Sequence, residues 1–199
     1  MNSEVKNGIP EPGWSNRVDD PEILSGLERR RRTAFKWGVV TVLLALAAPP
    51  AVSMFVKDSI KMGDALKLGC VIAGAIVVCS LFSKLARACK KPYEGVVTDK
   101  REELRHRGGK NRDTYSTEYV THVQLSSGGK TKIKESRKGA YSAWEYLKVG
   151  DRFRYNPKFA FPYELYDKSK AEHLFCPVCA KKNPVESDRC SRCHAPLLK

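Results

Sequence analysis

Residues 38–56, GVVTVLLALAAPPAVSMFV, and residues 68–83, LGCVIAGAIVVCSLFS, are two long runs without a charged side chain. A helix needs about 20 mainly apolar residues to cross the roughly 30 Å hydrocarbon core of a bilayer, and both runs reach that length when flanking residues are added. A surface helix of a soluble protein has a polar face at helical period, and neither run has one. The sequence therefore predicts a two-helix transmembrane hairpin over residues 35–91.

Positive charges lie at the outer ends of both runs. Arg29–Arg32 precede the first run, and the second is followed by Lys84, Arg87, Lys90 and Lys91. The connection at residues 57–64 carries two lysines balanced by two aspartates. Because Lys and Arg stay on the cytoplasmic side, we expect a multi-pass protein with two spans, both termini in the cytoplasm, and the lipid bilayer as its first partner.

An alternative topology is export of the C-terminal half. The stretch from Arg31 to Lys36 resembles a twin-arginine signal, and Ala45-Leu46-Ala47 resembles a cleavage site. The apolar run continues to Val56, which is long for a signal peptide, and a second run follows. We therefore favour the hairpin.

Within the hairpin, Pro49-Pro50 predicts a kink in the first helix, because proline rings crowd the preceding turn and donate no amide hydrogen. Small residues at four-residue spacing, Ala75, Cys79 and Ser83, predict the face on which the helices approach each other. Neither run contains an ionisable carboxylate, histidine or arginine, which argues against a transporter or channel.

The first 34 residues are polar and interrupted by prolines, and we expect a mostly disordered cytoplasmic leader with a short basic helix. Asp20-Pro21 is typical of a helix start, with aspartate as the N-cap and proline in the first turn. Ile23, Leu24 and Leu27 would share one face. That face suits docking on lipid or a partner, but we favour a simple extension of the membrane helix.

Residues 92–170 change to a period of two, which is typical of strands. Strands are expected at about 95–98, 119–125, 130–134, 152–156 and 163–167, with a short helix near Trp144. In the third strand, Thr131 and Ile133 would face inward and three lysines outward. Five short strands favour a small mainly-β domain of the OB or SH3-like barrel type, with an open α+β sheet as the alternative.

A basic segment, Lys100 to Asp113, lies between the first two predicted strands and is interpreted as a mobile hairpin tip. Such loops bind nucleic acid in some OB-type barrels, and Tyr115 and Tyr119 lie close enough in sequence to stack on bases. We favour a solvated loop near anionic lipid, where each cation adds about 1 kcal/mol of attraction.

The tail, residues 171–199, carries the most specific pattern in the chain. Two Cys-x-x-Cys motifs are separated by ten residues, and their cysteines are Cys176, Cys179, Cys190 and Cys193. Two such turns can present four thiolates to one ion in a tetrahedral site. All four positions are protein ligands, so the expected site is structural, with Zn²⁺ as the metal and iron as an open alternative. Metal binding, worth roughly 10–16 kcal/mol in comparable peptides, would supply the folding energy of so short a tail.

A different use of the second motif is also weighed, since Cys190 to His194 matches a c-type haem attachment site. Haem requires an exported tail and leaves the first motif without a role, so we disfavour it. His194 is instead expected in a turn with positive φ, which histidine tolerates better than most residues.

The two motifs together with Asn183-Pro184 resemble the short zinc ribbons appended to many bacterial and archaeal proteins. Glycine commonly follows each second cysteine in those ribbons, whereas this chain has Ala180 and His194. The stretches at residues 149–157 and 164–169 are similar to a small β domain that follows membrane helices in uncharacterised bacterial membrane proteins. The resemblance covers residues 93–199 and implies a bacterial inner-membrane protein without an established activity.

The composition and the motifs limit the classes of function that this protein can have. The 199-residue chain has a formal net charge of +14, which suits nucleic acid or an anionic membrane surface. Cys70, Cys79 and Cys89 lack the pattern of a disulfide framework. The four histidines are dispersed, and no phosphate-binding or nucleophile motif is present, so we expect no enzyme. The main hypothesis is a membrane-anchored binding or scaffold module with an unknown protein partner. Nucleic-acid binding at the membrane is the second hypothesis, and an exported haem or redox protein is the third.

Overall fold

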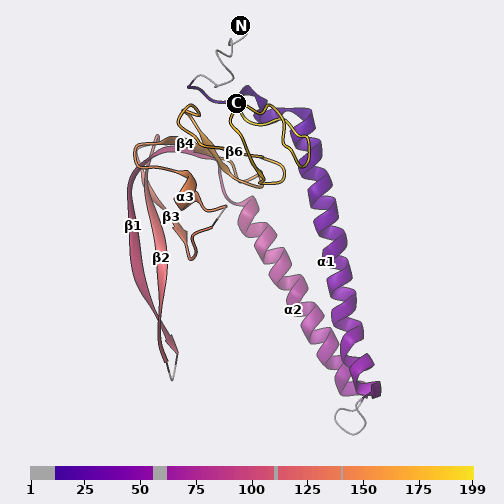
Figure 1. The fold of residues 1–199 in the computed structure, drawn as a ribbon. Coiled ribbons are helices and arrows are strands. Elements are labelled where there is room, and N and C mark those ends of the chain that lie inside the picture. Colours follow the sequence, from indigo (N-terminus) through magenta and orange to yellow (C-terminus); the bar gives the residue numbers. More distant parts are fainter. Residues whose placement is uncertain (1–11, 56–61, 110–111, 140) are drawn as a thin grey trace. The chain divides into compact units, whose positions relative to one another are not determined.

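The computed structural model describes residues 12–55, 62–109, 112–139 and 141–199 (Figure 1). The chain divides into two compact units. One is helical and comprises residues 28–90. The other contains residues 91–199 together with the start of the chain up to Leu27, and it is referred to below as the β unit.

The helical unit contains most of α1 (Pro21–Phe55) and all of α2 (Met62–Ala88). The two helices approach each other closely at Gly69, where an added Cβ would lie 3.1 Å from the carbonyl oxygen of Leu46. Ala65 and Ala73, one helical repeat before and after Gly69, are buried. Small residues at this spacing let helix backbones come together.

The predicted contact face of α2 was therefore wrong. Ala75, Cys79 and Ser83 are exposed. The physical reason is angular: Ala75 lies two positions, about 200°, beyond Ala73, on the opposite side of the helix. Both faces of α2 have small residues at four-residue spacing, so spacing alone did not decide between them. The first helix continues through Pro49 and Pro50 to Phe55.

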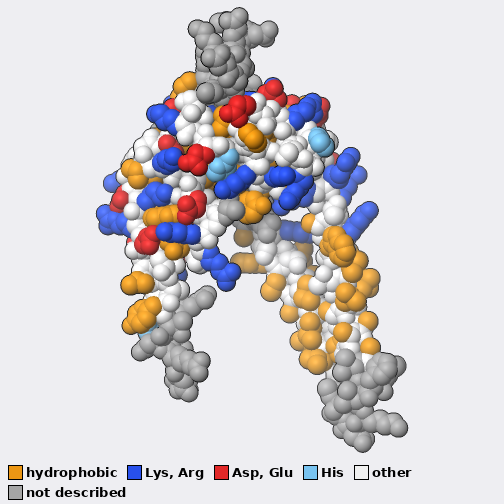
Figure 2. Space-filling model, viewed as in Figure 1, with side chains coloured by type: hydrophobic (Ala, Val, Ile, Leu, Met, Phe, Trp, Pro, Cys, Tyr) orange, Lys and Arg blue, Asp and Glu red, His pale blue; other side chains and the backbone are white. Residues whose placement is uncertain are grey.

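Within the described residues, one helix is long and apolar enough to cross a membrane, namely α2 over Gly63–Ala86. The other predicted span, in α1, is not confirmed. The end of the α1 apolar run at Val56 lies outside the described residues. Large apolar side chains on both helices are exposed, among them Trp37, Leu44, Val71 and Phe82. In Figure 2, hydrophobic side chains gather on the surface of the helices.

The β unit is built on an antiparallel sheet with the strand order β3-β2-β1-β4-β5. Its strands are β1 (Tyr93–Gly109), β2 (Arg112–Leu125), β3 (Lys130–Glu135), β4 (Arg152–Tyr155) and β5 (Tyr163–Leu165). The described edges β3 and β5 do not pair with each other, so the sheet is open and the OB or SH3-like barrel is not confirmed. The open α+β alternative describes this sheet better.

One face of the sheet covers a core that includes Val97, Val123, Tyr146, Leu147 and Phe153. The opposite face carries the ion-paired Glu94, Arg152 and Arg154 together with Val96 and Val120. Along β3, exposed and partly buried residues alternate, which confirms that Thr131 and Ile133 face inward and the three lysines outward. The short helix α3 (Ala143–Tyr146) lies over the core face.

Two charged side chains from the sheet hold α3 at its two ends. The carboxylate of Glu135 accepts hydrogen bonds from the Ala143 and Trp144 amides at 3.0 and 2.8 Å. Lys100 Nζ donates to the carbonyls of Trp144 and Leu147 at the other end. The first amides and the last carbonyls of a helix have no hydrogen-bond partner within it. A negative charge at the N-terminus and a positive charge at the C-terminus therefore stabilise this short helix.

The prediction of a mobile tip over Lys100–Asp113 is therefore wrong for residues 100–109, which belong to β1, and for residues 112–113, which belong to β2; residues 110–111 lie outside the described residues. The β1–β2 ladder continues through this segment to the pair Gly109–Arg112. Backbone hydrogen bonding carries the strands through residues that have no buried face, so the alternation that identifies a half-buried strand is missing there.

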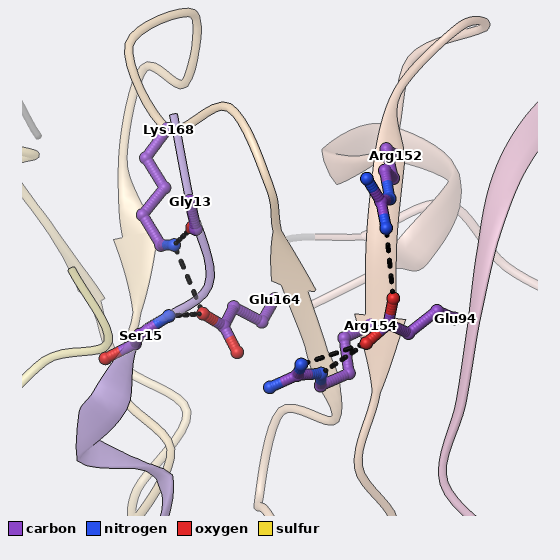
Figure 3. Close-up of polar contacts among 7 residues, drawn as sticks. All are labelled: Gly13, Ser15, Glu94, Arg152, Arg154, Glu164 and Lys168. Carbon is purple, nitrogen blue, oxygen red and sulfur yellow. Dashed lines mark hydrogen bonds and ion pairs between the residues drawn. The ribbon is translucent and has the colours of Figure 1, made fainter. Parts of the chain in front are cut away.

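The start of the chain forms a strap over the outer face of the β unit, beside β5. The Gly13 amide donates to the Tyr166 carbonyl at 2.8 Å, and the Ser15 amide donates to Glu164 Oε1 at 2.7 Å. Lys168 Nζ donates to the Gly13 carbonyl at 2.7 Å and to Glu164 at 3.1 Å (Figure 3). Both charged side chains are almost fully buried. Burial lowers the pKa of Lys168, and the Glu164 carboxylate opposes this shift.

Beyond the strap, a 3-10 helix, η2 (Asn16–Asp19), leads into α1. The Glu22 amide donates to Asp20 Oδ1 at 2.8 Å, as expected for an aspartate that caps a helix beginning at Pro21. The sequence predicts a mostly disordered leader; residues 1–11 lie outside the described residues, and residues 12–27 pack within the β unit.

Candidate metal centre

The four cysteines of the tail meet in one cluster. The sulfurs of Cys176, Cys179, Cys190 and Cys193 all lie within 4.8 Å of one another. The Cys176–Cys193 and Cys179–Cys190 sulfur pairs are each 3.5 Å apart. Two thiols come from the turn between β6 (Leu174–Phe175) and β7 (Lys182–Asn183), and two come from the turn after β7. This cluster can hold a metal ion such as zinc.

The two Cys-x-x-Cys turns have the same backbone pattern. The Ala180 amide donates to the Cys176 carbonyl, and the His194 amide donates to the Cys190 carbonyl, both at 2.9 Å. Ala180 and His194 have φ values of 60° and 58°. The positive φ expected at His194 is confirmed. Because both turns have this backbone conformation, the two thiols of one turn face the two thiols of the other.

Hydrogen bonds from backbone amides lower the pKa of the cysteine thiols, whereas burial raises it. Burial raises the pKa of the Cys176 thiol well above its ordinary value. Burial also acts on Cys190, but the amides of Cys193 and Arg192 and the neighbouring thiols outweigh it and lower the pKa to about 7. The Arg192 amide lies 3.4 Å from Cys190 Sγ. A cluster of four thiolates without a cation would carry strong like-charge repulsion, which a divalent ion removes.

Asn183 holds the two turns together. Its side chain is buried, and its Oδ1 accepts hydrogen bonds from the Ser191 amide at 2.9 Å and the Ser191 hydroxyl at 3.1 Å. Its Nδ2 donates to the Lys181 carbonyl at 2.8 Å. The sequence marked Asn183-Pro184 as a ribbon feature but gave no sign of this positioning role, because the partner Ser191 is one of many polar residues nearby.

The beginning of α1 packs on the ribbon, and this contact was not predicted. Ile23 and Leu27 are buried in one cluster with Cys176, Val178, Cys190 and Leu197. A Cβ at Gly26 would lie 3.0 Å from Val178 Cγ1, so glycine permits the close approach. The Glu22 carboxylate receives two hydrogen bonds from Arg189, at 2.8 and 3.3 Å. The predicted hydrophobic face therefore docks on the tail of its own chain, while Leu24 stays partly exposed.

Other candidate residues lie elsewhere. Tyr119 lies with its ring 5.4 Å from that of Trp144, and Tyr115 lies 5.2 Å from the His106 ring. The Nε2 atoms of His122 and His173 are buried without a hydrogen-bond partner. Burial lowers the pKa of His173. Among the described residues, the four-cysteine cluster is the group of potential metal ligands that the fold assembles.

Comparisons of this chain with protein-family models, with curated proteins and with solved structures found no match.

Proposed function

We propose that this protein is a membrane-anchored binding or scaffold module whose ribbon is fixed by a structural zinc ion. The observation that carries the proposal is the four-thiol cluster, which lies in a folded β unit on the same chain as a candidate membrane span. A small surface fixed by a metal can present side chains to a partner without a large core.

The chemistry of the donor set supports zinc in a structural role. Four cysteine sulfurs form a complete tetrahedral set, so the ion has no position left for water or substrate. We therefore infer a protein without enzymatic activity at this site. Cys190 and Cys193 lie in one cluster with the first motif, which supports a shared ion over haem attachment to the second motif alone.

Metal analysis of the purified full-length protein tests this step. We expect about one zinc per chain and a colourless protein. A visible thiolate-to-iron absorption would replace zinc by iron and make electron transfer the leading function. A haem spectrum would show that the tail is exported and would overturn the topology.

The proposed topology keeps two spans, α1 and α2, in the inner membrane of a bacterium with both termini in the cytoplasm. The close packing at Gly69, the exposed apolar side chains and the cationic flanks support it. Labelling of single cysteines at the two ends and in residues 57–61 by a membrane-impermeant reagent in intact cells tests it. Labelling confined to residues 57–61 is expected, whereas labelling at either end would contradict it.

The binding role is tested by purifying partners from detergent-solubilised membranes. The full-length chain is compared with Cys193→Ser, which removes one metal ligand, and with Arg192→Ala, which leaves the four ligands intact. Loss of specific partners only in Cys193→Ser is expected. Identical partner lists for all three proteins would remove the ribbon from the binding role.

A further inference from the structure

The β1–β2 hairpin extends beyond the rest of the sheet. β3 pairs with β2 only as far as Tyr119, and β4 pairs with β1 only over Tyr93–Val96. Residues 103–109 and 112–118 therefore form a two-stranded ribbon, here called the arm, which projects beyond β3 (Figure 1). An isolated two-stranded ribbon is marginally stable in water, so an arm of this length gains from a surface that covers it.

Side chains alternate between the two faces of the arm. The register pairs Leu104 with Thr117 and His106 with Tyr115, which places these four residues on one face. Leu104 is 77% exposed and Tyr115 is 63% exposed. They are diagonal neighbours on this face, close enough for long side chains to meet.

The other face of the arm is polar and carries ion pairs. Arg105 lies 3.2 Å from Glu118, and Lys134 of β3 contacts the same carboxylate at 3.2 Å. The described end of the arm, residues 107–109 and 112–113, carries two cations, Arg107 and Arg112, against one acidic residue, Asp113. The arm thus combines an exposed apolar and aromatic face with a cationic end.

We propose that the arm binds the surface of an anionic bilayer, with Leu104 and Tyr115 in the interfacial layer and the cationic end at the lipid headgroups. The inference rests on the proposed membrane anchoring. Only residues 89–92 lie between the end of α2 and the start of β1, so the β unit is tethered beside any membrane that α2 crosses. Tyrosine concentrates at membrane interfaces, and basic segments are attracted by anionic headgroups.

The aliphatic side chain of Leu104 favours lipid over nucleic acid as the ligand of the arm. Single-stranded nucleic acid is held by aromatic side chains that stack on bases, and an aliphatic side chain offers no stacking surface. Leucine gains from leaving water for the acyl boundary of a bilayer. The most exposed apolar side chain on the arm therefore fits lipid better than a base.

The test uses the full-length protein in nanodiscs of phosphatidylcholine, with or without about one-third phosphatidylglycerol. Amide hydrogen exchange is followed in residues 103–118, with residues 119–125 of β2 as the internal reference. We expect several-fold slower exchange of the arm in the anionic discs. The double variant Leu104→Ser, Tyr115→Ser should lose most of this slowing, because it retains only the cations.

The matched control is Val149→Ser, since Val149 is 60% exposed but lies outside the arm. It should behave like the unmodified protein. Equal arm exchange in both discs, or slowing that survives the double variant, overturns the inference. Slowing by a single-stranded oligonucleotide in detergent, without a lipid effect, would assign the arm to nucleic acid. Failure of the protein to enter nanodiscs at all would instead contradict the proposed anchoring.

Discussion

Asn183 shows how one uncharged side chain links the two turns of the four-cysteine cluster. It links the Ser191 amide and hydroxyl of the second cysteine turn to the Lys181 carbonyl beside the first. Hydrogen-bonded residues around a metal site orient its ligands, and their removal commonly weakens metal binding. The sulfurs depend on this link because they come from two separate turns.

We expect Asn183→Ala to weaken zinc binding by about tenfold, because the variant loses the partly buried hydrogen bonds that tie Ser191 to Asn183 and Asn183 to the Lys181 carbonyl. Competition with a chromophoric chelator measures the change. Lys181→Ala is the matched control, since it leaves the Lys181 carbonyl in place and should bind zinc as the unmodified protein does. Equal affinity of the two variants would show that Asn183 does not position the ligands.

Ala180 allows a test of the left-handed turn after the first cysteine pair. Its φ of 60° crowds Cβ against the backbone, which costs roughly 1 kcal/mol in a residue other than glycine. Ala180→Gly should therefore hold zinc at least as firmly in denaturant, whereas Ala180→Val should lose about 1–3 kcal/mol of stability. The guanidinium concentration at which each protein releases zinc measures the order of stability. An Ala180→Val variant as stable as the unmodified protein would contradict the prediction.

At the scale of the element, the helical hairpin depends on one close contact. Gly69→Leu would place a side chain against the carbonyl oxygens of Leu46 and Ala45 on α1. We expect a loss of about 1–3 kcal/mol in the stability of the helix pair, measured by thermal unfolding in detergent. Gly74→Leu is the control on the same helix, because nothing lies within 4 Å of a Cβ at that position. A loss of the same size in Gly74→Leu would place the contact elsewhere.

The elements also show what the sequence could and could not predict. The alternation of Lys130, Thr131, Lys132, Ile133 and Lys134 specified β3 and its inward face because one side of that strand is buried. Residues 103–106 are exposed and residues 116–118 are only partly buried, so no alternation marked these stretches as strands. The tail could be predicted because ligand identity and spacing specify a cysteine cluster locally.

The docking of the leader could not be predicted in the same way. Ile23 and Leu27 predicted an apolar face, but the other buried residues of their cluster lie more than 130 residues further along the chain. Two apolar residues in one turn suit many surfaces equally well. Long-range packing of this kind becomes visible only when the fold brings Val178 and Leu197 beneath the helix.

For the whole molecule, the shared core of leader and ribbon links metal binding to the start of α1. Removal of zinc by a chelator should increase hydrogen exchange in residues 174–198 and also in residues 20–27, because Ile23 and Leu27 pack against Cys176 and Cys190. The β2 and β3 peptides should change less, since the core of the sheet includes Phe175 of the ribbon but is otherwise built from residues outside it.

Exchange measured with and without chelator on the full-length protein checks this prediction. Ile23→Ala is a useful comparison, because it should loosen residues 20–27 while the metal stays bound. Unchanged exchange of residues 20–27 after complete zinc removal would show that the helix docks on a surface that does not depend on the ion.

The strap beside β5 also bears on how the protein is made. Ser15 bonds to Glu164 across 149 residues, and Glu22 bonds to Arg189 across 167 residues. A ribosome synthesises Ser15 and Glu22 long before it synthesises their partners, and both helices emerge in between. This segment is made before its partners and takes its place only after them, so a nascent chain must keep Ile23 and Leu27 from other apolar surfaces until Val178 and Leu197 have been synthesised.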